Sequence, residues 1–245
     1  MKRITHLLMA SLIVMAISGC KNDEPTTSDN SQKQEVPASF TRKQLIEHFT
    51  SESCGYCPYG IQAIQDFLAS NSTAVWVSHH KGYADDAFTV AGSSAITNLL
   101  KVNGAPSIAL NRTKTNYIDQ YDEAQSDVVF HPIYLSTMTS DLSTTTYASI
   151  VISNEYDAST RKLNIAISGQ VSDPNVSTLK LNVLLKESGL HGTQSDYINS
   201  YEGWSDFIHC NVVRAFISKT LGDEITITDQ AYHATYSIDI KDAWD

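Results

Sequence analysis

Apolar positions in the first half of the chain switch between strand-like and helix-like spacing. Short apolar stretches predict strands at residues 43–50, 74–78 and 107–110. Stretches with one apolar face at helical spacing predict helices at residues 58–70, 91–101 and 127–140. This alternation predicts an α/β fold over residues 41–142, in which helices cover a largely parallel sheet.

The pattern changes after residue 142. Apolar and polar residues then alternate, which predicts strands at residues 147–153, 163–171, 179–185, 212–217 and 235–240. Several strands in series with polar turns predict an all-β sandwich over residues 143–245. Residues 188–209 are rich in Gly, Ser, Tyr and Asn, and they are predicted to form a long loop.

The N-terminus has the pattern of an export signal rather than of a folded domain. Two basic residues precede an apolar run over residues 7–17, which is too short to span a bilayer. Residues 1–20 are therefore predicted to be a signal peptide. The run ends in Ser18, Gly19 and Cys20, which resembles the bacterial lipobox and implies cleavage before Cys20 and lipidation of Cys20. An ordinary cleaved signal with a chance cysteine is the alternative.

The charge and composition of the chain argue against some classes of binding partner. The formal net charge is −10, which argues against nucleic acid because phosphate binding depends on Lys and Arg. Residues 21–40 are polar and have too few apolar side chains to fold alone, so they predict a flexible tether. Attachment to the membrane is therefore expected through lipid on Cys20.

The other cysteines are Cys54, Cys57 and Cys210. Cys54-Gly55-Tyr56-Cys57 lies between a predicted strand and a predicted helix, so Cys54 is expected at a helix N-terminus. Unpaired N–H groups and the helix dipole there lower the pKa of a thiol. We expect an exposed Cys54 that attacks or is attacked, and a buried Cys57 that resolves the mixed disulfide. Cys210 is expected to be a buried apolar side chain.

A zinc site and a structural disulfide are the alternatives for the CxxC motif. Zinc takes four Cys or His ligands, and Cys210 is distant in sequence. His79 and His80 are neighbours on a strand and should point to opposite faces. We therefore predict no metal and no cofactor. A purely structural disulfide is disfavoured because so short a loop constrains the unfolded chain little.

Pro106 is the second element of the expected site. The segment Ala105-Pro106 resembles the loop of thioredoxin-like proteins in which a cis-proline faces the CxxC motif. That resemblance implies that the backbone of Ala105 binds an extended substrate peptide beside Cys54, and that Gly55 and Tyr56 contribute to the same surface. An ordinary turn proline is the alternative.

His48 occupies the position of the buried acid that thioredoxins carry on the strand before the CxxC motif. A histidine there could take a proton from Cys57 near neutral pH, and a packed polar residue is the alternative. Glu47 is the neighbouring residue and should face the other side of the strand.

Several short motifs together resemble the Omp28-related outer membrane lipoproteins of Bacteroidetes. They occur in the family's order between residues 47 and 215. The motifs are Glu47-His48-Phe49-Thr50 before the cysteines, His80-Lys81-Gly82, Gly104-Ala105-Pro106, Asn111-Arg112, Leu185-Lys186-Glu187 and His209-Cys210-Asn211-Val212-Val213-Arg214-Ala215. The resemblance implies an outer membrane lipoprotein that faces the periplasm or the cell surface. It also implies an α/β thioredoxin-like domain followed by an all-β immunoglobulin-like sandwich.

These features predict a membrane-anchored thiol-disulfide oxidoreductase or isomerase that acts on exported proteins with thiols or disulfides. Cys54, Cys57, Pro106 and His48 are its expected working residues, and an unidentified redox partner protein exchanges electrons with it. The Gly-Tyr dipeptide resembles that of periplasmic disulfide isomerases, but two residues do not fix the direction of electron flow. The alternative is a surface binding or adhesion lipoprotein whose β-sandwich is the working part and whose CxxC motif is structural or vestigial.

Overall fold

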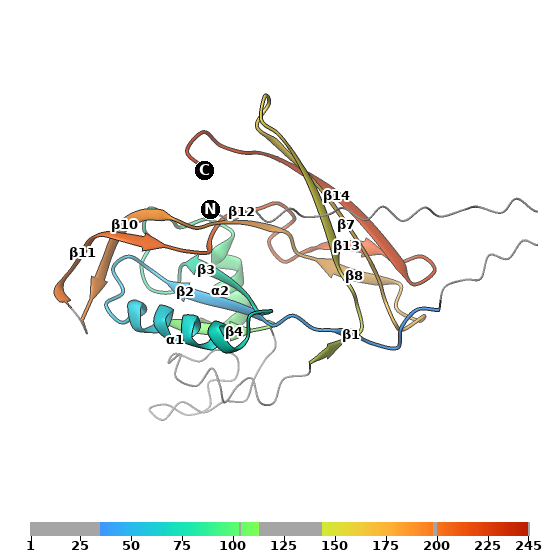
Figure 1. The fold of residues 1–245 in the computed structure, drawn as a ribbon, viewed down its shortest axis with the longest axis horizontal. Coiled ribbons are helices and arrows are strands. Elements are labelled where there is room, and N and C mark those ends of the chain that lie inside the picture. The colour runs from blue at the N-terminus through green and yellow to red at the C-terminus, as the bar shows by residue number, and fades with distance from the viewer. Residues whose placement is uncertain (1–34, 103, 113–143, 198–199, 245) are drawn as a thin grey trace, which may run out of the picture. The chain divides into compact units, whose positions relative to one another are not determined.

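The computed structural model describes residues 35–102, 104–112, 144–197 and 200–244. This part of the chain is mostly β-strand in several sheets, with two helices (Figure 1). The elements up to residue 112 are β1 (Phe40–Thr41), β2 (Leu45–Thr50), α1 (Cys57–Ser70), β3 (Val75–His80), α2 (Ser93–Leu100) and β4 (Ser107–Leu110). The later elements are β5 (Thr145–Thr146), β6 (Val151–Asp157), β7 (Lys162–Gln170), β8 (Thr178–Leu181), β9 (Leu184–Glu187), β10 (Leu190–Asp196), β11 (Ser200–His209), β12 (Val212–Phe216), β13 (Asp223–Thr226) and β14 (Ala231–Asp239).

The largest sheet has the strand order β4-β2-β3-β12-β9. Strands β2 and β12 run parallel to β3, whereas β4 and β9 run antiparallel to their neighbours at the two edges. Nearly every residue of β2 and β3 is buried, as expected for parallel strands that are covered on both faces.

The two helices cover opposite faces of this sheet. Ile46 of β2 packs with Ile64 of α1. Phe49, three residues further along the strand and therefore on the other face, packs with Ile96 of α2. Since α1 begins at Cys57, the CxxC motif lies at the edge of the sheet where β2 ends.

Five later strands form two antiparallel sheets with a common apolar core. The sheets are β14-β7-β6 and β13-β8. Their core contains Ile165, Ile167, Leu181, Val183 and Tyr232. Strand β6 lies at an edge and is exposed along its whole length, so this core is built by the other four strands.

The strands and helices predicted up to residue 110 are confirmed, with ends that differ by a few residues. The helix predicted at 127–140 lies outside the described residues, as do the signal peptide, the lipobox cysteine Cys20 and the division expected after residue 142. Strands β9 and β12 come from the predicted second domain but hydrogen-bond within the sheet of β2 and β3. Alternation of apolar residues predicts a strand, but it does not specify the sheet that the strand joins.

The loop predicted at residues 188–209 is instead the hairpin β10–β11. Its register shifts between Gly192 and Gln194 and again between Gln194 and Asp196. Gly, Ser, Asn and Asp have low strand propensity, and such irregular pairing interrupts the alternation that identifies a strand. The sequence pattern therefore did not reveal the hairpin.

Candidate functional site

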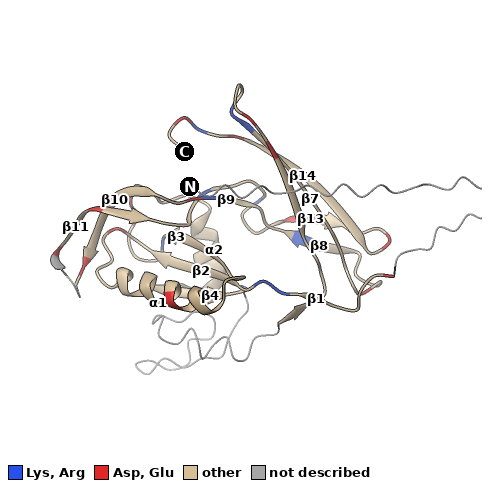
Figure 2. Ribbon diagram, viewed as in Figure 1, with Lys and Arg blue, Asp and Glu red and all other residues tan. Residues whose placement is uncertain are grey.

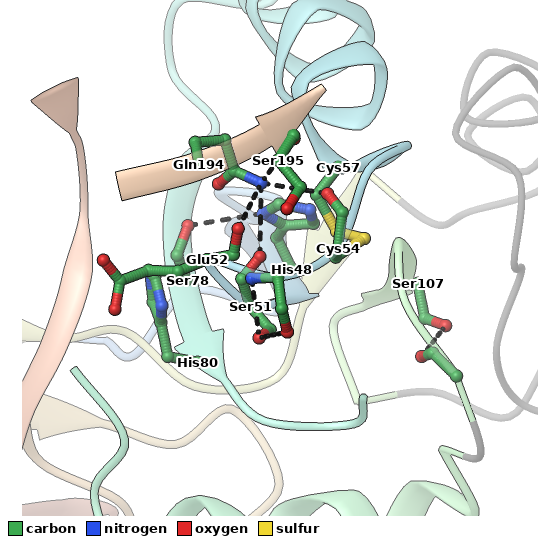
Figure 3. The surroundings of a disulfide bond; sticks show 12 residues. His48, Ser51, Glu52, Cys54, Cys57, Ser78, His80, Ser107, Gln194 and Ser195 are labelled. Carbon is green, nitrogen blue, oxygen red and sulfur yellow. Dashed lines mark hydrogen bonds between the residues drawn. A yellow bond between two sulfur atoms is a disulfide. The ribbon is translucent and has the colours of Figure 1, made fainter. Parts of the chain in front are cut away.

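Cys54 and Cys57 form a disulfide between the end of β2 and the start of α1 (Figure 3). Cys57 is the first residue of α1, and Pro58 lies in its first turn, where a missing N–H removes no helical hydrogen bond. The N–H of Cys57 donates to the carbonyl oxygen of Cys54 at 3.2 Å. The predicted cysteine pair is thus joined, and it lies at a helix N-terminus.

The proline loop lies at the same edge of the sheet. The Ala105–Pro106 peptide bond is cis. Ser107 follows it and pairs with Phe49, close to the end of β2. The Ser107 hydroxyl donates to the carbonyl oxygen of Gly104 at 2.7 Å, which closes the loop. Pro106 is buried and Ala105 is partly exposed.

His48 is fully buried and is drawn among the residues that surround the disulfide (Figure 3). Its Nδ1 lies 3.4 Å from the hydroxyl of Ser78, and its ring centroid is 6.2 Å from that of Trp76. Its Nε2 has no hydrogen-bond partner in the described part of the chain. Burial, followed by the charges of His80 and His79, lowers the pKa of His48 to about 3. The ring is therefore neutral at pH 7.

Glu47 lies on the opposite face of β2, as predicted, in a buried polar network. Arg112 donates to its carboxylate through Nη2 at 2.7 Å and through Nε at 2.8 Å. His79 lies 3.3 Å from the same carboxylate, and its other ring nitrogen lies 3.0 Å from the hydroxyl of Ser93. Burial alone would raise the pKa of Glu47, but the hydrogen bonds from His79 and Arg112 outweigh it and lower the pKa. This network faces α2 and is separated from the disulfide by the sheet.

Cys54 is not the exposed sulfur that the sequence predicted. Only 3% of its surface is exposed, and Cys57 is fully buried. The cause is the hairpin, because residues 193–197 lie over the loop at residues 51–55 (Figure 3). Sequence spacing gave no indication that a segment 140 residues away would cover the motif.

The backbone of residues 193–197 pairs with this loop as an added strand would. The N–H of Ser195 donates to the carbonyl oxygen of Glu52 at 2.7 Å, and the N–H of Tyr197 donates to that of Gly55 at 2.9 Å. A Cβ placed on Gly55 would lie 2.3 Å from the ring of Tyr197, so only glycine leaves room for the ring there. The Tyr197 ring also meets the ring of Tyr56 edge-on, with centroids 5.7 Å apart.

Gln194 fixes the loop that precedes Cys54. Its side chain is almost fully buried, and its Nε2 lies 2.9 Å from the carbonyl oxygen of Cys54 and 3.3 Å from those of Ser51 and Glu52. Glu52 in turn accepts from the N–H of Thr193 at 2.8 Å. Gln194 was not predicted as a site residue, because it lies in the segment that was expected to be a loop.

A histidine and aspartate cluster supports the other side of the same loop. Asp86 lies 2.7 Å from Nδ1 of His80 and accepts from the N–H of Glu52 at 2.8 Å. Burial would raise the pKa of Asp86, but the hydrogen bond and charge of His80, together with the N–H groups of Glu52 and Phe88, outweigh it and lower the pKa. His209 stacks edge-on against His80, with centroids 5.1 Å apart. Burial and the charge of His80 lower the pKa of His209. Within the described ranges, no group of three His, Cys, Asp or Glu side chains could hold a metal ion.

An apolar cavity lies between α1 and β11, beside the first turn after the disulfide. Its volume is about 460 Å³, and its lining includes Tyr59, Trp204, Phe207 and Ile208. Cys210 lines the same cavity and is partly exposed with a free thiol, so the prediction that it is buried is wrong. The cavity could accept apolar side chains of a bound polypeptide.

Comparisons with known proteins give a family and a fold. The family described as outer membrane protein Omp28 matches residues 93–245, which begin at the first residue of α2 and exclude the cysteine pair. HBP35 of Porphyromonas gingivalis is similar in structure, with 18% identity and a TM-score of 0.64, over 82% of this chain and 65% of that chain. The chain therefore spans 65% of the length of that relative, and at this identity the likeness shows the fold alone.

A second solved structure is less similar to this chain. A structural-genomics protein from Agrobacterium tumefaciens is similar over 82% of this chain and 79% of that chain, but with 15% identity and a TM-score of 0.42. A search of curated proteins found no match. In the part of the chain with described coordinates, no helix has the length and apolar character needed to cross a membrane.

Proposed function

Because the chain belongs to the Omp28 outer membrane protein family and is located at the outer membrane, we propose that it is an anchored thiol-disulfide oxidoreductase or isomerase. Its substrates are exported proteins with thiols or disulfides. One observation carries the proposal, which is the Cys54–Cys57 disulfide at the N-terminus of α1. Such a position stabilises a thiolate and so favours exchange.

The surroundings of the disulfide support a thioredoxin-like domain. The elements follow the order β2-α1-β3-α2-β4, the helices lie on opposite faces, and Pro106 precedes β4 at the edge where β2 ends. We assign the two antiparallel sheets around Ile167 and Leu181 to an immunoglobulin-like sandwich. In this arrangement the redox pair lies on the α/β part, and the sandwich is a separate surface for contacts.

The exchange reaction proceeds through a mixed disulfide. A substrate thiolate attacks Sγ of Cys54, the Cys54–Cys57 bond breaks, and Cys57 leaves as a thiolate that takes a proton. A second substrate thiolate then attacks the substrate sulfur of the mixed disulfide and releases Cys54. Two electrons and two protons pass from the substrate to the cysteine pair, and a partner protein with a disulfide removes them again. Reduction of a substrate disulfide is the same sequence in reverse.

His48 is the proton acceptor in this proposal. In the tautomer whose Nδ1–H donates to Ser78, Nε2 carries a lone pair and has no other partner in the described structure. Since the pKa of His48 is about 3 while the disulfide is intact, the ring takes a proton only when a thiolate nearby compensates the charge. It would accept the proton of Cys57 as that thiol attacks.

The anchor is lipid on Cys20 after removal of the signal peptide. The polar segment at residues 21–40 then connects the anchored end to the folded part, facing the periplasm or the cell surface. Lipid carries the attachment because the net charge of −10 opposes binding to anionic lipid. Nucleic acid is not a partner in this proposal.

The reduction potential of the cysteine pair tests the proposal. The purified chain is equilibrated in dithiothreitol or glutathione buffers, and the thiols are counted by alkylation. We expect a potential between about −120 and −270 mV, where known exchange proteins lie. A potential below about −300 mV is typical of structural disulfides and would contradict the proposal.

Trapping of substrates tests the roles of the two cysteines. Cys57→Ser should accumulate mixed disulfides with exported proteins, because Cys54 remains and cannot be released by its neighbour. Cys54→Ser should accumulate none, and Cys210→Ser is the matched control for a cysteine outside the pair. Insulin reduction and refolding of a scrambled substrate then separate a reductase from an isomerase.

A binding or adhesion protein is the second candidate, and two observations favour it. Cys54 is only 3% exposed, as in a structural disulfide. The edge strand β6 also exposes Val151 and Ile152, each by 63%, and an exposed apolar edge is typical of a surface that pairs with another chain. This candidate would be favoured by a reduction potential of the cysteine pair below about −300 mV, together with unchanged binding of Cys54→Ser to whole cells.

A further inference from the structure

Residues 193–197 lie on the redox motif as a bound strand would. We call them the cover strand. Its donors are the N–H groups of Ser195 and Tyr197, two residues apart, and its acceptors are the carbonyl oxygens of Glu52 and Gly55. Residues i and i+2 of a strand present their N–H groups to the same side, and this is how an extended peptide adds to an exposed edge.

Among the described residues, the backbone hydrogen bonds of the cover strand go to its own hairpin and to residues 52–55. In the described sheets, β10 pairs with β11 alone, and two-stranded hairpins are marginally stable by themselves. At the base of the hairpin, Gly189 has φ +83° and Asn211 has φ +57°. Both residues lie between the hairpin and the large sheet, so rotation there could move the hairpin as a unit.

We propose that residues 52–55 form a binding edge for an extended polypeptide substrate, and that the cover strand occupies this edge. The cover strand must leave before a thiol reaches Cys54. This inference rests on the proposed redox function and adds the substrate class, which is an unfolded, extended segment. A ligand within the same chain has a high effective concentration. A folded protein cannot offer a free strand to replace it, so only unfolded exported chains compete.

The contacts also specify what the binding edge accepts. The ring of Tyr197 fills the space above Gly55, where a Cβ would lie 2.3 Å away, so this subsite takes an aromatic side chain. The hairpin has three acidic residues and no Lys or Arg (Figure 2). These acidic residues are unchanged in the variants compared below, so any repulsion of an anionic thiolate is the same in each protein.

Dithiothreitol is the probe. One of its thiolates attacks Sγ of Cys54, and Cys57 leaves as a thiolate that takes a proton. Its second thiolate displaces Cys54, which gives oxidised cyclic dithiothreitol and two protein thiols. The rate is measured on the oxidised chain by acid quench, alkylation and mass spectrometry, so no protein substrate is needed.

Tyr197→Ala is the test variant, and Tyr156→Ala on β6 is its matched control. The two tyrosines are exposed by 48% and 46%, but only Tyr197 contacts the motif. We expect Tyr197→Ala to be reduced about tenfold faster, since it loses an aromatic contact, while Tyr156→Ala stays within about twofold of the unaltered chain. Equal rates in all three proteins would overturn the inference.

Hydrogen exchange of the unaltered chain provides a second measurement. The amides of Ser195 and Tyr197 exchange only when the cover strand leaves the loop. We expect their opening rate to equal the limiting rate of reduction at high dithiothreitol concentration. Reduction that is much faster than this opening would show that the reagent reaches Cys54 past the cover strand, and would overturn the inference even if a variant misfolds.

The outcomes separate this inference from the proposed function. A reduction potential below about −300 mV together with faster reduction of Tyr197→Ala would refute the redox function. It would still support the inference that the cover strand shields Cys54. A reduction potential between about −120 and −270 mV with no effect of Tyr197→Ala on the reduction rate would support the redox function. It would refute the inference that the cover strand must leave first.

Discussion

His48 and Glu47 are neighbours on β2, and their side chains reach opposite faces of the sheet. His48 lies with the disulfide and α1, and Glu47 binds Arg112 on the side of α2. Both side chains are fully buried. Both residues should therefore affect the stability of the fold, and the pH ranges in which they do so separate them.

Stability should fall between pH 6.5 and pH 5 because of His48. Its pKa is about 3 in the folded protein and 6.5 when free, so the unfolded state binds a proton that the folded state does not. The free energy of unfolding then falls as the pH falls below 6.5, by about 1.4 kcal/mol per pH unit. Between pH 7 and pH 5, His48→Gln should therefore lose about 2 kcal/mol less free energy of unfolding than the unaltered chain, measured by urea unfolding.

His191→Gln is the control for this measurement. His191 is exposed beside Asp206, so its replacement measures the effect of removing a histidine that is not buried. The lowered pKa of His209 should preserve part of the dependence in His48→Gln. An identical pH dependence in the unaltered chain and His48→Gln would show that His48 is not neutral in the folded state.

Arg112→Met should be strongly destabilising because it leaves the carboxylate of Glu47 buried without its main partner. Loss of one member of a buried pair costs about 3–5 kcal/mol. The control is Lys81→Met, which breaks an exposed pair with Asp85 and should cost at most about 1 kcal/mol. Urea unfolding at pH 7 measures both.

The pair of Glu47 and Arg112 affects stability in a more acidic pH range than His48 does. The pKa of Glu47 is lowered below 4.5 in the folded protein, so the stability from this pair is fully present above pH 4.5 and is lost as the pH falls through the folded pKa. The difference between Arg112→Met and the unaltered chain should therefore shrink only in acid. If Arg112→Met costs no more than Lys81→Met, the network contributes little to stability.

The local elements around these residues could be predicted from the sequence, since strand and helix periodicity are properties of short segments. The opposite orientation of His48 and Glu47 follows from strand geometry alone. The expectation that Pro106 faces the cysteines came instead from the resemblance of its loop to that of thioredoxin-like proteins. The burial of Cys54 does not, because it depends on Gln194 and Tyr197, which are distant in the chain and lie in an irregular hairpin.

Gly55→Ala should disturb the site only while Tyr197 is present. The added methyl group would lie 2.3 Å from the Tyr197 ring, and such overpacking costs about 1–3 kcal/mol. In a Tyr197→Ala background the methyl group has space, so the cost should disappear. A double-mutant cycle by urea unfolding should give a coupling of about 1 kcal/mol or more. Additive effects would mean that the ring does not rest on Gly55.

Residues 36–143 should not fold by themselves. Strand β3 is hydrogen-bonded to β12 on one side, and Lys186 of β9 donates to the carbonyl oxygen of Trp76 on β3 at 3.0 Å. Without residues 184–216 that edge of β3 lacks its partner, which is costly for a buried strand. Heat unfolding monitored by circular dichroism should show one cooperative transition for residues 36–245 and none for the fragment. A cooperative transition of the fragment would support an independent domain that ends near residue 142.

The mixed strand order is another part of the fold that the sequence did not reveal. Val212 reads as the start of a strand, but its pairing with Ser78 joins segments that are far apart in the chain. Periodicity reports which face of a strand is buried and not which neighbour it has. The expected sequential division into two domains therefore could not be checked from pattern alone.

The shared sheet has a consequence for the order of events during export. A chain that crosses a membrane from its N-terminus delivers Cys54 and Cys57 long before β12 and the hairpin arrive. Throughout that interval the two thiols lie in an incomplete sheet without the segment that later shields them. A disulfide that formed during that interval would therefore form before the segment that shields Cys54 is present.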